Sequence, residues 1–121
     1  MAHANGMDWI RLPKRMAIYH RDGFDCAYCR LVFPLDPLGY GLTLDHVEGP
    51  LDHRPENLVT ACTECNKAKD TDTLEHFIQT RGLDRAVLQR VGELTSRPLD
   101  MVEGRRLAAL RRPNGARTIR A

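Results

Sequence analysis

The chain has 121 residues and a formal net charge of +2, with 42% hydrophobic and 28% charged residues. This length suits one domain, and the composition excludes a collagen-like or intrinsically disordered chain. No apolar run approaches the roughly 20 residues of a membrane-spanning helix, and the first residues lack the apolar segment of a secretory signal. We therefore expect a cytoplasmic protein that does not associate with membranes.

The charge is unevenly distributed along the chain. Residues 1–103 have a net charge of −4, whereas residues 104–121 contain six arginines and no acidic residue. A basic end of this kind either lies free in solvent or contacts nucleic acid through sequence-independent phosphate contacts, and the pattern alone favours neither.

The first half of the chain reads as a helix followed by a small mixed module. Residues 12–23 are typical of a short helix, with Pro13 in its first turn and Gly23 as its stop. Residues 24–49 predict a cysteine knuckle, a loop and a strand near residues 42–46. A polar loop follows, then a short strand or helix entry at residues 57–61 and a helix over residues 62–70.

Beyond residue 72 the pattern becomes helical. A first helix should be capped by Thr71 or Asp72 and ended by Gly82. Two further amphipathic helices should follow, the last weakened by Gly104 and stopped by Pro113. The apolar residues of the three helices are Leu74, Phe77 and Ile78; Leu83, Val87, Leu88, Val91 and Leu94; and Leu99, Val102, Leu107 and Leu110.

Four cysteines form two CxxC pairs, Cys26 with Cys29 and Cys62 with Cys65. Four thiolates suit a tetrahedral structural zinc site, in which each CxxC supplies two ligands from one tight turn. Disulfides and a redox-active CxxC are the alternatives, but no secretory signal supports the first, and the second needs only one pair. We predict one structural Zn²⁺ that takes no part in chemistry. The 32 residues between the pairs exceed the usual zinc-ribbon spacing of about 15–20, so other functional residues can lie between them.

The segments CAYC, LTLDHVEG and PENLVTACTECNKAKD follow one another along the chain. Their order and spacing resemble the HNH endonucleases, in which a CxxC pair, an Asp-His pair ending a strand, an Asn-Leu-Val stretch and a CxxCN with a following lysine recur. The resemblance covers residues 21–70. It implies an α+β fold, a small ββα-metal module with a four-cysteine zinc clamp, here followed by a helical C-terminal extension. We expect the module and its N-terminal helix to occupy residues 1–72, the extension residues 73–112, and a basic tail residues 113–121.

The resemblance also implies a function, the hydrolysis of DNA phosphodiester bonds with a catalytic Mg²⁺ or Mn²⁺. His46 matches the general base that activates water, and Asn57 matches the asparagine that holds the loop and orients that base. Asn66 stands in place of the last histidine, which makes this an HNN variant; Asp45 and Asn66 would bind the catalytic cation. Lys69 matches a lysine placed near phosphate. The candidate DNA contacts are His53, Arg54, Lys67, Arg111 and Arg112.

The chemistry of these side chains agrees with those roles. Oxygen atoms of Asp45 and Asn66 suit hard divalent cations, and a histidine with a pKa of about 6.5 accepts a proton near neutral pH. Adjacent residues of a regular strand point to opposite faces, so Asp45 and His46 share one site only if the strand ends there. Glu48, close to the base, would either repel phosphate or hold a basic group.

Two other functions remain open. One is a non-catalytic, zinc-dependent module that binds nucleic acid, and the other is a structural zinc protein that binds other proteins through its C-terminal helices. The first of these is disfavoured by the presence together of Asp45, His46, Asn57, Asn66 and Lys69, because binding alone needs no histidine that activates water.

Overall fold

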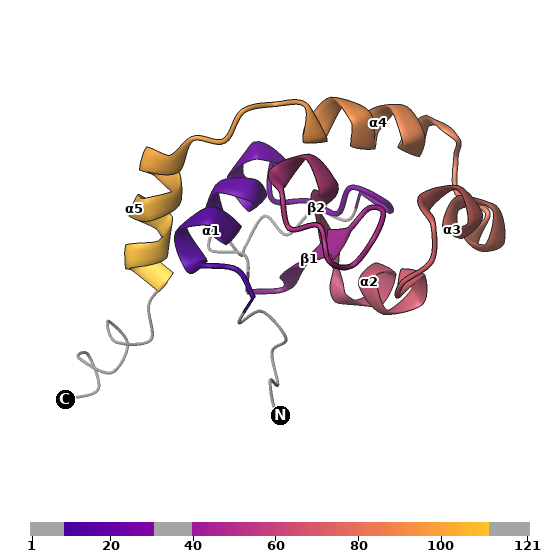
Figure 1. Ribbon diagram of the computed structural model, residues 1–121, viewed down its shortest axis with the longest axis horizontal. Helices are drawn as coiled ribbons and strands as arrows, with labels where there is room; N and C mark the ends of the chain where they lie inside the picture. The colour runs from indigo at the N-terminus through magenta and orange to yellow at the C-terminus, as the bar shows by residue number, and fades with distance from the viewer. Residues whose placement is uncertain (1–8, 31–39, 112–121) are drawn as a thin grey trace.

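The computed structural model describes residues 9–30 and 40–111. Helix α1 (Leu12–Arg21) precedes an antiparallel pair of strands, β1 (Leu42–His46) and β2 (Leu58–Cys62), and helix α2 (Thr63–Lys69) follows β2 directly (Figure 1). The predicted α+β class, with its ββα order, is confirmed. The other elements are the 3-10 helix η1 (Pro55–Asn57) and the helices α3 (Leu74–Arg81), α4 (Ala86–Thr95) and α5 (Met101–Arg111). The basic tail expected at residues 113–121, including Pro113, lies outside the described residues.

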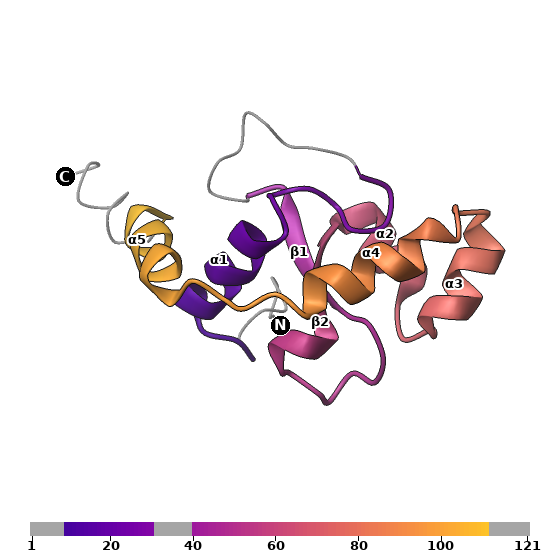
Figure 2. The ribbon, with the colours of Figure 1, turned by 90° about the horizontal axis from the view of Figure 1, so that it is seen from above.

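Two apolar clusters lie on opposite sides of the strand pair. On one side, Leu42 and Leu44 of β1 pack against α1 and α5. On the other side, Val59 and Ala61 of β2 pack against the cysteines and the helices α3 and α4. Figures 1 and 2 both place α1 beside α5, and α3 and α4 at the opposite end of the molecule. The hairpin is thus held between the two clusters, which fixes the end of β1 in space.

A buried ion pair at the end of α1 holds β2. The guanidinium of Arg21 lies 2.7 Å from the Asp22 carboxylate and donates to the carbonyls of Leu58 (2.6 Å) and Pro55 (3.0 Å). Asp22 in turn accepts the amide of Thr60 at 2.8 Å. Because each charge is paired and hydrogen-bonded, the pair is tolerated in the core and fixes α1 to β2.

The cap of α3 differs from the prediction. The hydroxyl of Thr73 accepts the amide of His76 at 3.2 Å, so Thr73 is the N-cap rather than Thr71 or Asp72. The preceding residues form the turn that ends α2, in which the Asp72 amide donates to the Lys69 carbonyl. Gly82 ends α3 in the left-handed conformation, as predicted.

The apolar stripe predicted for the last helix is only partly right: Leu107 is buried and Leu99 packs against the same cluster, but the other two residues are not buried. Val102 and Leu110 are 71% and 59% exposed, whereas Gly104, Leu107 and Ala108 are buried. Gly104, predicted to weaken the helix, lies where α5 crosses α1. A Cβ atom added there would stand 2.4 Å from the Pro13 carbonyl oxygen. Close helix packing, and not only the spacing of large side chains, therefore sets the buried face of α5.

The crossing makes a prediction for stability. We expect Gly104→Ala to destabilise the fold by about 1–3 kcal/mol, because the added methyl also meets the Ala17 Cβ at 2.8 Å. Gly92→Ala in α4 is the matched control, since its added Cβ would meet nothing within 4 Å and alanine favours helix over glycine by about 0.5–1 kcal/mol. Urea unfolding midpoints measure both variants. A Gly104→Ala protein as stable as Gly92→Ala would show that α1 and α5 can move apart at their crossing with no loss of folding free energy.

Candidate active site

A cavity of about 320 Å³ lies where β1 ends against α2. Three of the predicted site residues, Asp45, His46 and Asn66, line it together. The other lining residues are Gly49, Pro50, Lys67, Asp70, Thr71 and Asp72. His46 is the last residue of β1, so the regular alternation of side chains stops there. This allows the neighbouring residues Asp45 and His46 to line the same cavity.

The carboxylate of Asp45 is fixed from two sides. The hydroxyl of Tyr28 donates to Oδ2 at 2.5 Å, and the ammonium of Lys69 lies 3.1 Å from the same oxygen. Burial raises the pKa of Asp45, and Tyr28 and Lys69 oppose that rise. Oδ1 accepts no hydrogen bond from the residues that the structure describes. One oxygen of this carboxylate is therefore oriented, and the other remains able to bind a cation.

His46 lies in a cluster of three rings. Its Nε2 is 2.9 Å from Nδ1 of His53, and the ring of Trp9 packs against both histidines, with centroids 4.6 and 4.8 Å away. Burial lowers the pKa of His46, and the charges of His53 and Lys69 lower it further. The lowered pKa favours the neutral ring of His46, which is the form that accepts a proton.

Asn57 is buried and closes the loop after His46. Its Oδ1 accepts the amide of Glu48 at 2.8 Å, and its Nδ2 donates to the carbonyls of Gly49 (3.1 Å) and Asp52 (2.9 Å). Its own carbonyl accepts the amide of Val47 at 2.8 Å. One side chain thus ties together the segment on which the position of His46 and His53 depends.

Asn66 is oriented by the neighbouring strand. Its Nδ2 donates to the Leu44 carbonyl at 3.1 Å and to the Thr43 hydroxyl at 3.2 Å. The amide group therefore presents Oδ1 away from β1, and within the described chain this oxygen accepts no hydrogen bond. Together with Asp45, it supplies the cavity with a second oxygen of the kind that Mg²⁺ and Mn²⁺ prefer.

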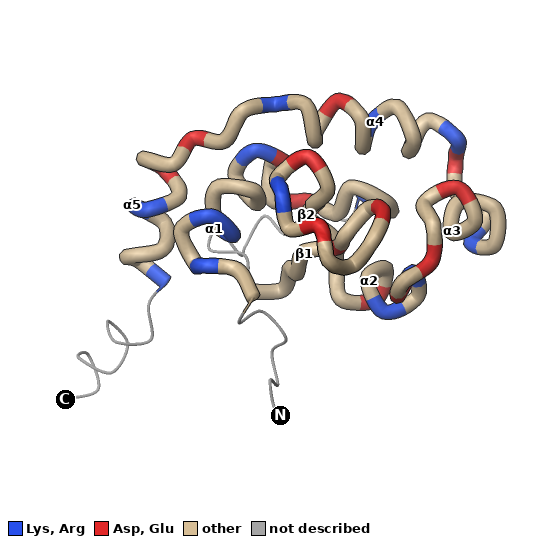
Figure 3. The backbone as a smooth tube through the Cα atoms, in the orientation of Figure 1, with Lys and Arg blue, Asp and Glu red and all other residues tan. Residues whose placement is uncertain are grey.

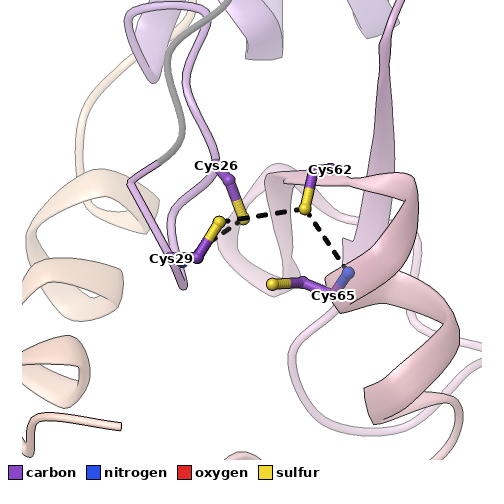
Figure 4. A group of neighbouring side chains, drawn as sticks. All are labelled: Cys26, Cys29, Cys62 and Cys65. Atoms are coloured by element: carbon purple, nitrogen blue, oxygen red, sulfur yellow. Dashed lines mark hydrogen bonds between the residues drawn. The ribbon is translucent and has the colours of Figure 1, made fainter.

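The four cysteines converge at the other end of α2 (Figure 4). Their Sγ atoms all lie within 4.8 Å of one another, and those of Cys29 and Cys62 are 3.8 Å apart. A zinc–sulfur bond of about 2.3 Å in a tetrahedron requires sulfur atoms about 3.8 Å apart, so the donor set fits zinc. The amides of Cys29 and Cys65 donate to the first sulfur of their own pair, at 3.5 and 3.4 Å. Burial raises the pKa of the Cys26 thiol to about 11, a cost that a bound divalent cation would offset.

The segment that carries both sites matches a known family. Residues 26–72 match the model of the HNH endonuclease family, from the first cysteine to the last acidic residue of the cavity. These residues form an HNH endonuclease domain. None of the curated proteins compared with the chain matches it. The helices α1, α3, α4 and α5 lie outside the match. No helix among the described residues is long and apolar enough to cross a membrane.

In the HNH domain, Lys69 lies inside the protein. Its side chain is 1% exposed, and its ammonium donates to the His46 carbonyl at 2.8 Å besides pairing with Asp45. This geometry places the positive charge beneath the end of β1 rather than on the surface of the cavity. A contact between Lys69 and phosphate stays a prediction.

The predicted DNA contacts fall in different places. Lys67 is exposed and lines the cavity, whereas Arg54 is exposed and paired with Asp52 at 2.8 Å. Arg111 lies far from the cavity in the sequence, with its guanidinium 4.3 Å from the ring centroid of Tyr40. Arg112 lies outside the described residues.

Glu48 was expected to repel phosphate or to hold a basic group. Its carboxylate accepts the amide of Leu74 at 3.2 Å and so joins the loop to α3. Two other residues of the site were missed from the sequence. Tyr28 links the first cysteine pair to Asp45, and Trp9 covers both histidines. A tyrosine inside a CxxC pair is a usable signal, because a buried phenol needs a hydrogen-bond partner.

Proposed function

We propose that the protein is a metal-dependent endonuclease that hydrolyses phosphodiester bonds of DNA. The observation that carries the proposal is the meeting of Asp45, His46 and Asn66 at one cavity of about 320 Å³. Two oriented side-chain oxygens and one neutral histidine are what cation-assisted hydrolysis of a phosphodiester requires.

Each residue of the site has a distinct role in the proposed reaction. Asp45 and Asn66 would hold a Mg²⁺ or Mn²⁺, which when bound stabilises the charge on the phosphate and the leaving oxygen. His46 accepts a proton from the attacking water, and its lowered pKa favours the neutral ring for that step. Tyr28 and Lys69 orient the carboxylate of Asp45.

A non-catalytic module that binds nucleic acid is the alternative. The zinc clamp and the basic residues would serve it equally well. It gives no reason for two oxygens that accept no hydrogen bond from the described residues beside a histidine of lowered pKa, which is why the nuclease is preferred.

Cleavage of supercoiled plasmid tests the proposal directly. The zinc-loaded protein should convert the plasmid to nicked or linear forms in Mg²⁺ or Mn²⁺, and should not do so when both are omitted. Retention of duplex DNA in a shift assay without cleavage in any divalent cation would favour the alternative. Neither cleavage nor binding would favour a structural zinc protein with protein partners.

The two oxygen ligands make a further prediction. Asn66→Ala should raise the Mg²⁺ or Mn²⁺ concentration at half-maximal cleavage by about tenfold or more, because one of two protein ligands is lost. Asn66→Asp, which retains an oxygen at the same place, is the matched control and should keep a requirement near that of the wild type. Cation titrations of the initial cleavage rate measure both. An unchanged requirement in Asn66→Ala would remove Asn66 from the cation site.

A further inference from the structure

A basic surface lies on α1 and on the end of α5. It consists of Arg11, Lys14, Arg15 and Arg111 and is called here the α1 basic surface. Arg11, Lys14 and Arg15 are three and four residues apart, so they share one face of the chain as it enters α1. Neither α1 nor the part of α5 after Glu103 contains an acidic residue. Figure 3 shows the blue segments of α1 and of the lower end of α5 with no red among them.

This surface begins at the candidate active site. The ammonium of Lys14 donates to the carbonyl of His53 at 2.9 Å, and His53 in turn contacts His46. Trp9, two residues before Arg11, packs against both histidines. Lys14 of the α1 basic surface is therefore linked to the proposed base, His46, through the single residue His53.

Three charges of the surface have no carboxylate partner among the described residues. Arg15 donates to the hydroxyl of Tyr19 at 3.0 Å, and Lys14 donates to the His53 carbonyl. Arg11 is exposed and forms no ion pair with the described residues. These contacts orient Lys14 and Arg15 but leave their charge uncompensated within the described part of the chain, so the surface attracts an anion.

The loop beside the surface does not neutralise it. Asp52 influences His46 by its charge, but both of its carboxylate oxygens are bonded to Arg54, at 2.9 and 2.8 Å. The lining of the cavity includes the carboxylates of Asp70 and Asp72 and a single cation of α2, Lys67. Phosphates that leave the cavity toward α2 thus meet acidic and basic groups together, whereas those that leave toward α1 meet the cations of the α1 basic surface.

We propose that the α1 basic surface binds the sugar-phosphate backbone of the DNA next to the phosphate that is cleaved. The inference rests on the proposed function for its ligand. It assigns DNA binding to residues outside the matched HNH segment, because Arg11, Lys14 and Arg15 precede residue 26 and Arg111 follows residue 72. The expected contacts are to phosphates and carry no sequence preference.

The test is the salt dependence of binding to a labelled 20-base-pair duplex, measured with the zinc-loaded full chain and without Mg²⁺ or Mn²⁺. Arg11→Gln combined with Lys14→Gln should weaken binding and lower the slope of log affinity against log salt by about 1.8, or about 0.9 for each lost phosphate contact. Arg81→Gln combined with Arg97→Gln is the matched control, because it removes the same charge from exposed residues of α3 and of the segment after α4. It should leave the slope close to that of the wild type.

Three results would overturn the inference. The first is a slope in the Arg11/Lys14 variant equal to that of the control. The second is absence of duplex binding by the wild type at low salt. The third is equally tight binding of poly-L-glutamate at matched salt, which would mark a surface for acidic proteins. The nuclease proposal is judged separately. A chain that binds DNA through the α1 basic surface but never cleaves it would refute only the nuclease proposal. Cleavage by a chain whose Arg11/Lys14 variant keeps the wild-type salt slope would refute only the proposal of the α1 basic surface.

Discussion

Replacement of His46 by alanine should lower the rate of DNA cleavage by about 10²–10⁴-fold, the usual contribution of a positioned general base. The loss should appear in the cleavage step and not in binding, since the charges proposed to hold DNA lie on other residues. Zinc content should also stay unchanged, because the four cysteines lie at the other end of α2. Single-turnover cleavage, with the protein in excess over DNA and Mn²⁺ saturating, measures the effect.

His20→Ala is the matched control for this experiment. His20 is exposed on α1, so the same substitution there should leave cleavage and folding unchanged. If His46→Ala cleaves as fast as His20→Ala, His46 is not the base, and the pairing of His46 with His53 would direct attention to His53 instead.

Much of the ββα order was predictable from local signals, although residues 57–61 alone fitted either a strand or a helix entry, and the second strand was expected only from the resemblance. Pro13 and Gly23 bracket α1, an apolar alternation marks β1, and the second CxxC lies at the start of α2. The spacing of the two cysteine pairs was equally informative, since ligands of one metal must meet in space whatever lies between them.

The contacts that complete the site were not predictable in this way. Trp9 and Tyr28 reach the site from segments distant in sequence, and nothing local indicates which strand residue they meet. Lys69 was assigned to phosphate from its motif position, but its burial depends on how α2 packs against β1. The face of α5 was mispredicted in part for a related reason. Apolar periodicity counts large side chains and correctly selected Leu107, but close packing on α1 also selects Gly104 and Ala108.

Replacement of Cys62 by serine should abolish tight zinc binding and unfold the domain. Cys62 ends β2, its sulfur accepts the Cys65 amide at the start of α2, and it lies 3.8 Å from the sulfur of Cys29. Structural zinc contributes about 10–16 kcal/mol in small zinc domains, which matches or exceeds the 5–15 kcal/mol that typically separates folded from unfolded chains. Without this ion, the remaining free energy of folding is therefore too small to keep the two apolar clusters packed against the strand pair.

Elemental analysis and thermal unfolding measure the consequence together. The wild type should contain about one zinc ion per chain, the stoichiometry of a single closed four-cysteine site. Cys62→Ser should contain little zinc and show no cooperative unfolding transition. Thr63→Ser, one residue further along and exposed, is the matched control and should retain both the zinc and the transition. A folded wild type that contains no zinc would contradict the assignment of the four cysteines. A folded Cys62→Ser protein that still holds zinc would instead show that three thiolates suffice, because hydrogen bonds and packing at the end of β2 would then hold the hairpin against α2.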